Sequence, residues 1–115
     1  MIHKDYFPEL QTKGWTKLFR CKMNCARRYY GKPINISKNG GYRTKADNKK
    51  AGGAPGSYHV RGRAVDIPIT NKRKRFLLAM ALWEADITYV MIYSSHIHAD
   101  DSKRSCQIGY GGKSK

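Results

Sequence analysis

The apolar residues in the first third of the chain follow the spacing of an amphipathic helix. They are Trp15, Leu18, Phe19, Met23, Ala26 and Tyr30. Intervals of three and four residues bring side chains to one face of a helix with 3.6 residues per turn. The pattern predicts a helix from Thr16 to Tyr30, with its aromatic stripe in the core.

A second helix is expected around residues 76–83, where apolar residues cluster again. These residues are Phe76, Leu77, Ala79, Met80 and Trp83. We expect them to form the face through which this helix packs under a sheet.

Two apolar segments predict strands. Ala64 to Ile69 reads AVDIPI and follows a turn at Gly62, whereas Tyr89 to Ala99 is rich in Tyr, Val, Ile and Met. Such residues fit the half-buried surface of a pleated strand. Ile34 and Ile36 alternate with polar residues before an Asn39-Gly40-Gly41 turn, which indicates a further short strand.

These elements predict a small single domain over residues 1–115, of the α+β class, with an antiparallel sheet and helices packed on one side. Ile108 and Tyr110 would form a last edge strand before Gly111. A chain of this length buries one core, and no repeat or linker divides it. Residues 1–15 carry acids and a proline but no apolar run. We therefore expect neither a secretory signal nor membrane insertion, and a soluble monomer.

Charge and cysteine content add limited information. The chain has 23 Lys and Arg residues against 8 Asp and Glu, a formal net charge of +15. This field attracts polyanions such as nucleic acid, acidic membranes or the anionic polymers of a bacterial wall. A helix-turn-helix or an aromatic–basic alternation is not recognisable, so a solvated basic surface is the default. Cys21, Cys25 and Cys106 are interpreted as idle or buried thiols, since three cysteines cannot all pair.

Two short segments, SYHVRGRAVD and HIHAD, gather three of the four histidines and two carboxylates. Catalytic zinc is usually held by three protein ligands, with a fourth position left open. The candidate ligands are His59, Asp66 and His98. Along the second segment, alternation of period two places His96, His98 and Asp100 on one face of a strand, which core packing alone does not explain.

The spacing S-x-H-x-x-G-x-A-x-D resembles the signature of the M15 peptidases, the D-Ala-D-Ala carboxypeptidase or hedgehog-like metallopeptidase family. Its positions are Ser57, His59, Gly62, Ala64 and Asp66. The preceding residues, from Gly40, are similar to the family's Y-R-(S/T) turn, Asn and glycine pair. They include Tyr42, Arg43, Asn48, Gly52 and Gly53. The resemblance covers residues 33–100 and ends in IYSSHIHAD, where His98 matches the last ligand.

The resemblance implies a zinc-dependent peptidase with a hedgehog-like fold, in which Zn²⁺ activates water and polarises the scissile carbonyl. Many members place an acid three residues before the last ligand, where this chain has Ser95. Other members use a catalytic histidine in an H-x-H arrangement, which His96 matches. We favour His96 as the general base, with Asp100 as the second candidate.

The resemblance also gives roles to two polar residues. Arg43 is expected to anchor substrate or stabilise transition-state charge, because a guanidinium matches a carboxylate with two donors. Ser57 would hydrogen-bond substrate or orient the ligand loop.

The implied substrate is the peptidoglycan stem peptide. The small size and basic charge resemble those of a phage enzyme for lysis or wall entry, made in the host cytoplasm or delivered with a phage particle. Two other classes remain open: a non-catalytic zinc-bearing binding module, and a basic nucleic-acid-binding protein.

Overall fold

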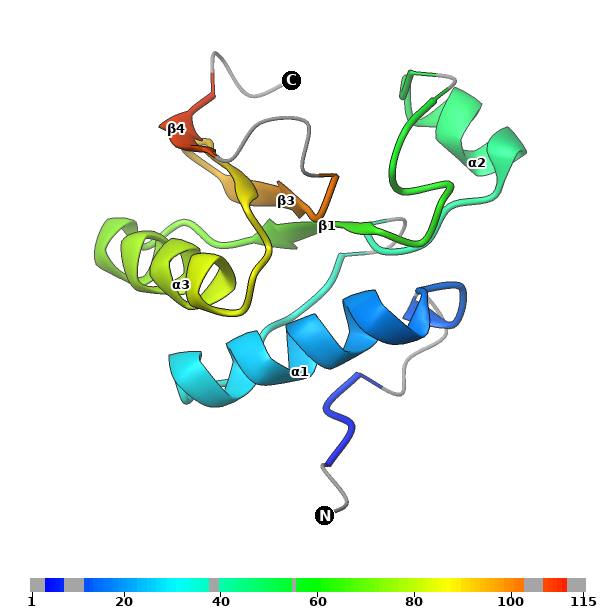
Figure 1. The fold of residues 1–115 in the computed structure, drawn as a ribbon. Coiled ribbons are helices and arrows are strands. Elements are labelled where there is room, and N and C mark those ends of the chain that lie inside the picture. Colours follow the sequence, from blue (N-terminus) through cyan, green and yellow to red (C-terminus); the bar gives the residue numbers. More distant parts are fainter. Residues whose placement is uncertain (1–3, 8–11, 38–39, 55, 103–106, 112–115) are drawn as a thin grey trace.

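The computed structural model describes residues 4–7, 12–37, 40–54, 56–102 and 107–111 (Figure 1). In chain order the elements are α1 (Lys17–Tyr30), α2 (Lys45–Lys50), β1 (Ala64–Pro68), α3 (Lys72–Glu84), β2 (Tyr89–Ile92), β3 (His96–Asp100) and β4 (Gln107–Tyr110). Helices combined with one sheet confirm the predicted α+β class.

Helix α1 begins and ends where the sequence predicts. The Thr16 hydroxyl accepts a hydrogen bond from the backbone N–H of Phe19 at 3.0 Å, which satisfies one of the unpaired donors of the first turn. Gly31 ends the helix with φ 78°, a left-handed conformation that favours glycine. The expected stripe is buried, as shown by Phe19 and Met23, but Leu18 is 61% exposed and does not belong to it.

The predicted core face of α3 is wrong except for Ala79, which is buried. The side chains that enter the core are Leu78, Ala79, Ala81 and Leu82, whereas Phe76, Leu77 and Met80 are exposed. Apolar residues surround most of this helix, so periodicity alone cannot select the buried side. Packing against the sheet and α1 makes the selection.

The sheet has the order β1-β3-β2-β4. β3 pairs antiparallel with both β1 and β2, whereas β2 and β4 are parallel, so the sheet is mixed and not purely antiparallel. The single strand predicted over residues 89–99 is a hairpin, because the chain turns back between β2 and β3. β4 confirms the expected edge strand, but Ile34 and Ile36 lie in an irregular segment that fixes Ile34 in the core without strand pairing.

The two faces of the sheet have different chemistry. α1 and α3 lie on one side, with α2 away from both (Figure 1). Toward α1 and α3 the strands present apolar side chains such as Val65, Ile97 and Ala99, which are fully buried. Asp66 and His98 alternate with these residues and therefore lie on the opposite face.

A buried ionic cluster joins α1 to the sheet. Asp101, 2% exposed, follows β3 and accepts from Arg63 Nε at 2.6 Å. Lys22 of α1 lies 3.4 Å from the same carboxylate and 3.5 Å from Asp86. None of the helices in the described ranges has the length and apolar character needed to cross a membrane.

Candidate metal centre

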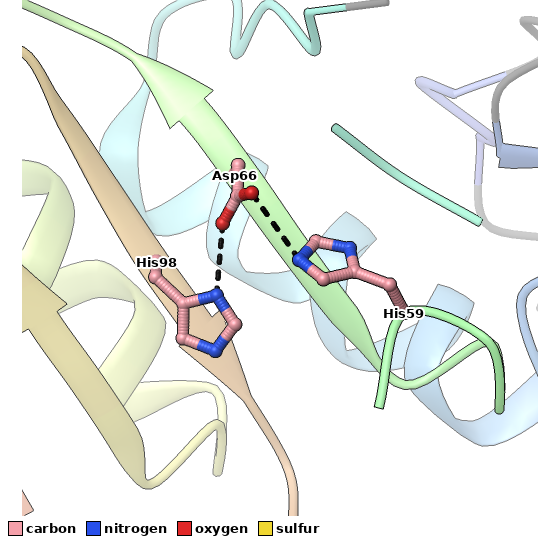
Figure 2. Close-up of side chains that lie close together, drawn as sticks. All are labelled: His59, Asp66 and His98. Atoms are coloured by element: carbon pink, nitrogen blue, oxygen red, sulfur yellow. Dashed lines mark hydrogen bonds and ion pairs between the residues drawn. The ribbon is translucent and has the colours of Figure 1, made fainter. Parts of the chain in front are cut away.

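Three side chains from two strands and one loop converge on the open face of the sheet. Asp66 and His98 are directly paired across β1 and β3, and His59 comes from the loop before β1 (Figure 2). One nitrogen or oxygen atom from each residue lies within 4.8 Å of the other two. The strand register and the turn before β1 thus assemble the predicted ligand set.

Asp66 stands between the two histidines. Its Oδ1 lies 2.8 Å from His98 Nδ1, and its Oδ2 lies 3.2 Å from His59 Nε2. Burial alone would raise the pKa of the Asp66 carboxyl, but the hydrogen bonds and charges of the two imidazoles outweigh burial and lower it well below its ordinary value. The carboxylate is therefore ionised and available as a ligand.

Backbone contacts fix the orientation of His59, which is 3% exposed. Its Nδ1 lies 2.8 Å from the carbonyl oxygen of Gly41, an acceptor that requires the proton on this nitrogen. The other ring nitrogen, Nε2, consequently faces Asp66. The Ser57 hydroxyl accepts a hydrogen bond from the His59 backbone N–H at 3.2 Å, so in this structure Ser57 orients the loop.

The sequence predicts only a turn at Gly40 and Gly41, whereas in the structure both residues contact candidate ligands. The Gly40 carbonyl accepts from Asp66 N at 2.6 Å, while the Gly41 carbonyl faces His59. A Cβ on Gly40 would lie 2.7 Å from the Asp66 carbonyl oxygen. The glycine pair itself could have predicted this close approach of two backbone segments, because glycine has no Cβ to prevent it.

His98 has a carboxylate at each ring nitrogen. Nε2 lies 2.8 Å from Oδ2 of Asp100, opposite the Nδ1 contact with Asp66. Burial would lower the pKa of His98, but hydrogen bonds to the two carboxylates and their charges raise it to about 9. Metal-free His98 is therefore an imidazolium at neutral pH, and one of its two protons occupies the position that a cation would take.

Asp100 is fully buried, and it also accepts from the backbone N–H of Ser102 at 3.1 Å. Burial would raise the pKa of Asp100, but the hydrogen bonds from His98 and Ser102 outweigh burial and lower the pKa below its ordinary value. A buried carboxylate that holds the outer nitrogen of a ligand histidine fixes its tautomer and raises its basicity. The position of Asp100 is that of an orienting group.

The donor set fits zinc. Two imidazole nitrogens and one carboxylate oxygen are among the ligands that hold catalytic zinc and leave a fourth position open. Each histidine turns one nitrogen inward while an oxygen acceptor holds the other, as ligand histidines require. Residues His59, Asp66 and His98 would hold the ion.

Arg43 reaches the same cluster from the segment before α2. Its Nη2 lies 3.0 Å from Asp66 Oδ2, and its Nη1 lies 3.4 Å from Asn48 Oδ1. The side chain is 13% exposed. The family resemblance predicts a substrate anchor here, and the structure places the guanidinium directly against a candidate ligand.

His96 lies at the start of β3, on the same face as His98. Its ring stacks on Tyr93 with centroids 4.6 Å apart and an interplanar angle of 9°. Ser95 Oγ lies 3.0 Å from His96 Nδ1. The partly exposed ring is two residues from the ligand pair along the strand, with its orientation set by these two neighbours.

The comparison with known families agrees with this geometry. The sequence model of the family described as Peptidase M15 matches residues 11–100. The matched region includes all candidate ligands, as well as Arg43, His96 and Asp100. The chain has no significant match to a curated protein or to a solved structure.

Proposed function

Because the chain belongs to the M15 peptidase family, we propose that it is a zinc-dependent peptidase that hydrolyses peptidoglycan stem peptides. The carrying observation is the convergence of His59, Asp66 and His98, within 4.8 Å, on the open sheet face. When bound, zinc supplies Lewis-acid activation of water and of the scissile carbonyl.

His96 is the proposed general base. It is partly exposed on the face that carries the ligands, so water and substrate can reach its ring. Asp100 is buried and already engaged with His98 and Ser102, which suits orientation better than proton transfer.

Arg43 is proposed to serve both Asp66 and substrate. Its positive charge stabilises the ionised Asp66 carboxylate and keeps that oxygen in place. The same charge, at the border of the site, would stabilise a substrate carboxylate or the negative charge that develops on the scissile carbonyl oxygen.

The substrate proposal rests on the family and on charge. Stem peptides carry carboxylates and are attached to a wall with anionic polymers, and a net charge of +15 would hold the protein near such a matrix. A small basic wall hydrolase of this kind suits a phage enzyme for lysis or wall entry.

The deciding experiment is turnover of purified peptidoglycan, with mass analysis of the released peptides and metal analysis of the protein. We expect one zinc per chain and soluble peptides that identify the cleaved bond. His59→Ala and His98→Ala should each lose most of the zinc and the activity. Full zinc in both variants would refute the ligand assignment, whereas bound zinc without turnover in the unaltered protein would indicate a non-catalytic binding module.

A further inference from the structure

Five of the seven large apolar side chains exposed in the described ranges belong to α3 and β4. They are Phe76, Leu77, Met80, Ile108 and Tyr110. Single exposed apolar residues are ordinary, but a group gathered on neighbouring elements marks a contact surface. The other two, Leu18 and Tyr29, belong to α1 and offer a natural comparison.

This surface is hollowed. A groove of about 650 Å³ lies between α3 and the ends of β2 and β4, with an apolar wall of Phe76, Leu77, Ile92 and Tyr110. We refer to it as the α3–β4 groove. It lies on the side of the sheet that packs on α3, whereas His98 faces the opposite side, so the groove is separate from the metal centre.

The composition of α3 indicates that its outer face is covered in use. Leu78 and Leu82 fill the core, while Phe76 is 55% and Met80 49% exposed on the other side. A surface helix normally carries polar residues on its outer face, and a helix that is apolar on both sides is normally buried. We therefore expect a partner to cover the exposed apolar face of α3.

Charge selects an anionic partner. The first turn of α3 reads Lys72, Arg73, Lys74 and Arg75 and contains no acidic residue. Lys72, Arg73 and Arg75 also line the groove. These cations add to the positive end of the helix dipole. A second copy of the chain would bring the same cations against them, which disfavours self-association.

We propose that the α3–β4 groove docks the protein on an anionic lipid bilayer. Exposed apolar side chains beside a cluster of Lys and Arg combine the two attractions that hold a protein at an anionic membrane surface: burial of apolar area in the interface and attraction to anionic lipids. Phe76, Leu77 and Met80 would enter the acyl boundary, with Tyr110 at headgroup level. Lys72 and Arg73 would face the lipid phosphates.

The test measures co-sedimentation with vesicles of phosphatidylcholine alone or mixed with phosphatidylglycerol. We expect binding only to the anionic vesicles. The double variant F76S/L77S should bind at least tenfold more weakly, while L18S/Y29S, which also removes two exposed apolar side chains, should stay within twofold of the unaltered protein. K72E/R73E should lose at least tenfold, and K49E/K50E, with the same change in net charge on α2, should lose much less.

Analytical sedimentation of the lipid-free protein tests for self-association, and we expect a monomer. Equal binding to neutral vesicles, equal losses in both charge variants, or unchanged binding of F76S/L77S would overturn the proposal. A dimer that F76S/L77S dissociates would overturn it too, because the groove would then hold a second copy. Vesicle binding needs no turnover, so these outcomes are independent of the peptidase activity.

Discussion

At the scale of single residues, each candidate ligand is held by a neighbour that fixes one of its polar atoms. The Gly41 carbonyl holds His59, Asp100 holds His98, and Arg43 contacts Asp66. The other ring nitrogen of each histidine faces the Asp66 carboxylate. Such a preorganised set would accept a cation by exchanging protons rather than by moving backbone.

Zinc affinity should therefore depend on pH. The pKa of His98 is about 9 without metal, so between pH 7 and 8 zinc must displace a proton from this ring. We expect the Kd to tighten about tenfold per pH unit in this interval. Competition with a chromophoric chelator measures it. Asp100→Asn, which keeps an acceptor but removes a charge, should flatten the dependence, whereas a pH-independent Kd for the unaltered protein would show that His98 is neutral.

The roles of His96 and Asp100 should be distinguishable by the effects of their substitution on zinc binding and on turnover. His96→Ala is expected to keep its zinc and lose turnover by about 10²-fold or more, the usual contribution of a general base. Asp100→Asn should instead weaken zinc binding by about 10- to 100-fold, the usual effect of losing an orienting partner. Metal content and peptide release distinguish the two. An active His96→Ala together with a zinc-loaded, inactive Asp100→Asn would reverse the assignment.

At the scale of elements, the loop between α2 and β1 is fixed at the end next to β1. The Gly62 carbonyl accepts from Thr16 N at 3.0 Å, which ties the loop to the start of α1. Arg63 binds Asp101 after β3, and Lys22 of α1 joins the same carboxylate. These contacts hold the residues that connect His59 to Asp66.

Gly62 should be the most sensitive position in this loop. Its φ is 72°, and a Cβ there would lie 2.1 Å from the Gly14 carbonyl oxygen. Gly62→Ala should lower the free energy of unfolding of the metal-free protein by about 2–4 kcal/mol, from left-handed strain plus overpacking, and weaken zinc binding. Gly52→Ala has a similar φ of 77° but open space around it. It should cost only about 1–2 kcal/mol in urea unfolding and leave zinc affinity unchanged; equal losses would contradict the packing argument.

Local signals explain which elements the sequence could predict. Thr16 and Gly31 bound α1 through contacts within a few residues, so its limits were readable. The buried face of α3 could not be predicted, because Phe76 and Leu78 are both strongly apolar. Only packing against segments distant in sequence decides that Leu78 is buried and Phe76 is exposed. The parallel pairing of β4 and the approach of Gly41 to His59 likewise depend on contacts between distant segments.

At the scale of the whole molecule, the fold separates three surfaces. One sheet face packs on the helices, the other carries the candidate metal centre, and the α3–β4 groove lies where α3 meets the ends of β2 and β4. The whole chain carries a formal net charge of +15. Long-range attraction by such a charge requires no particular residue, whereas docking through the groove does.

Binding to isolated cell walls should therefore respond to salt. As ionic strength rises from 0.1 M to 1 M, the Debye length falls from about 10 Å to about 3 Å, and attraction between the basic surface and the anionic wall is screened. We expect metal-free protein, which leaves the wall intact, to co-sediment with walls at 0.1 M salt and to be largely released at 1 M. F76S/L77S should show the same salt profile, because it keeps the charge. Retention at 1 M would mean that the protein recognises a wall component by short-range contacts, and charge would then not be what holds it there.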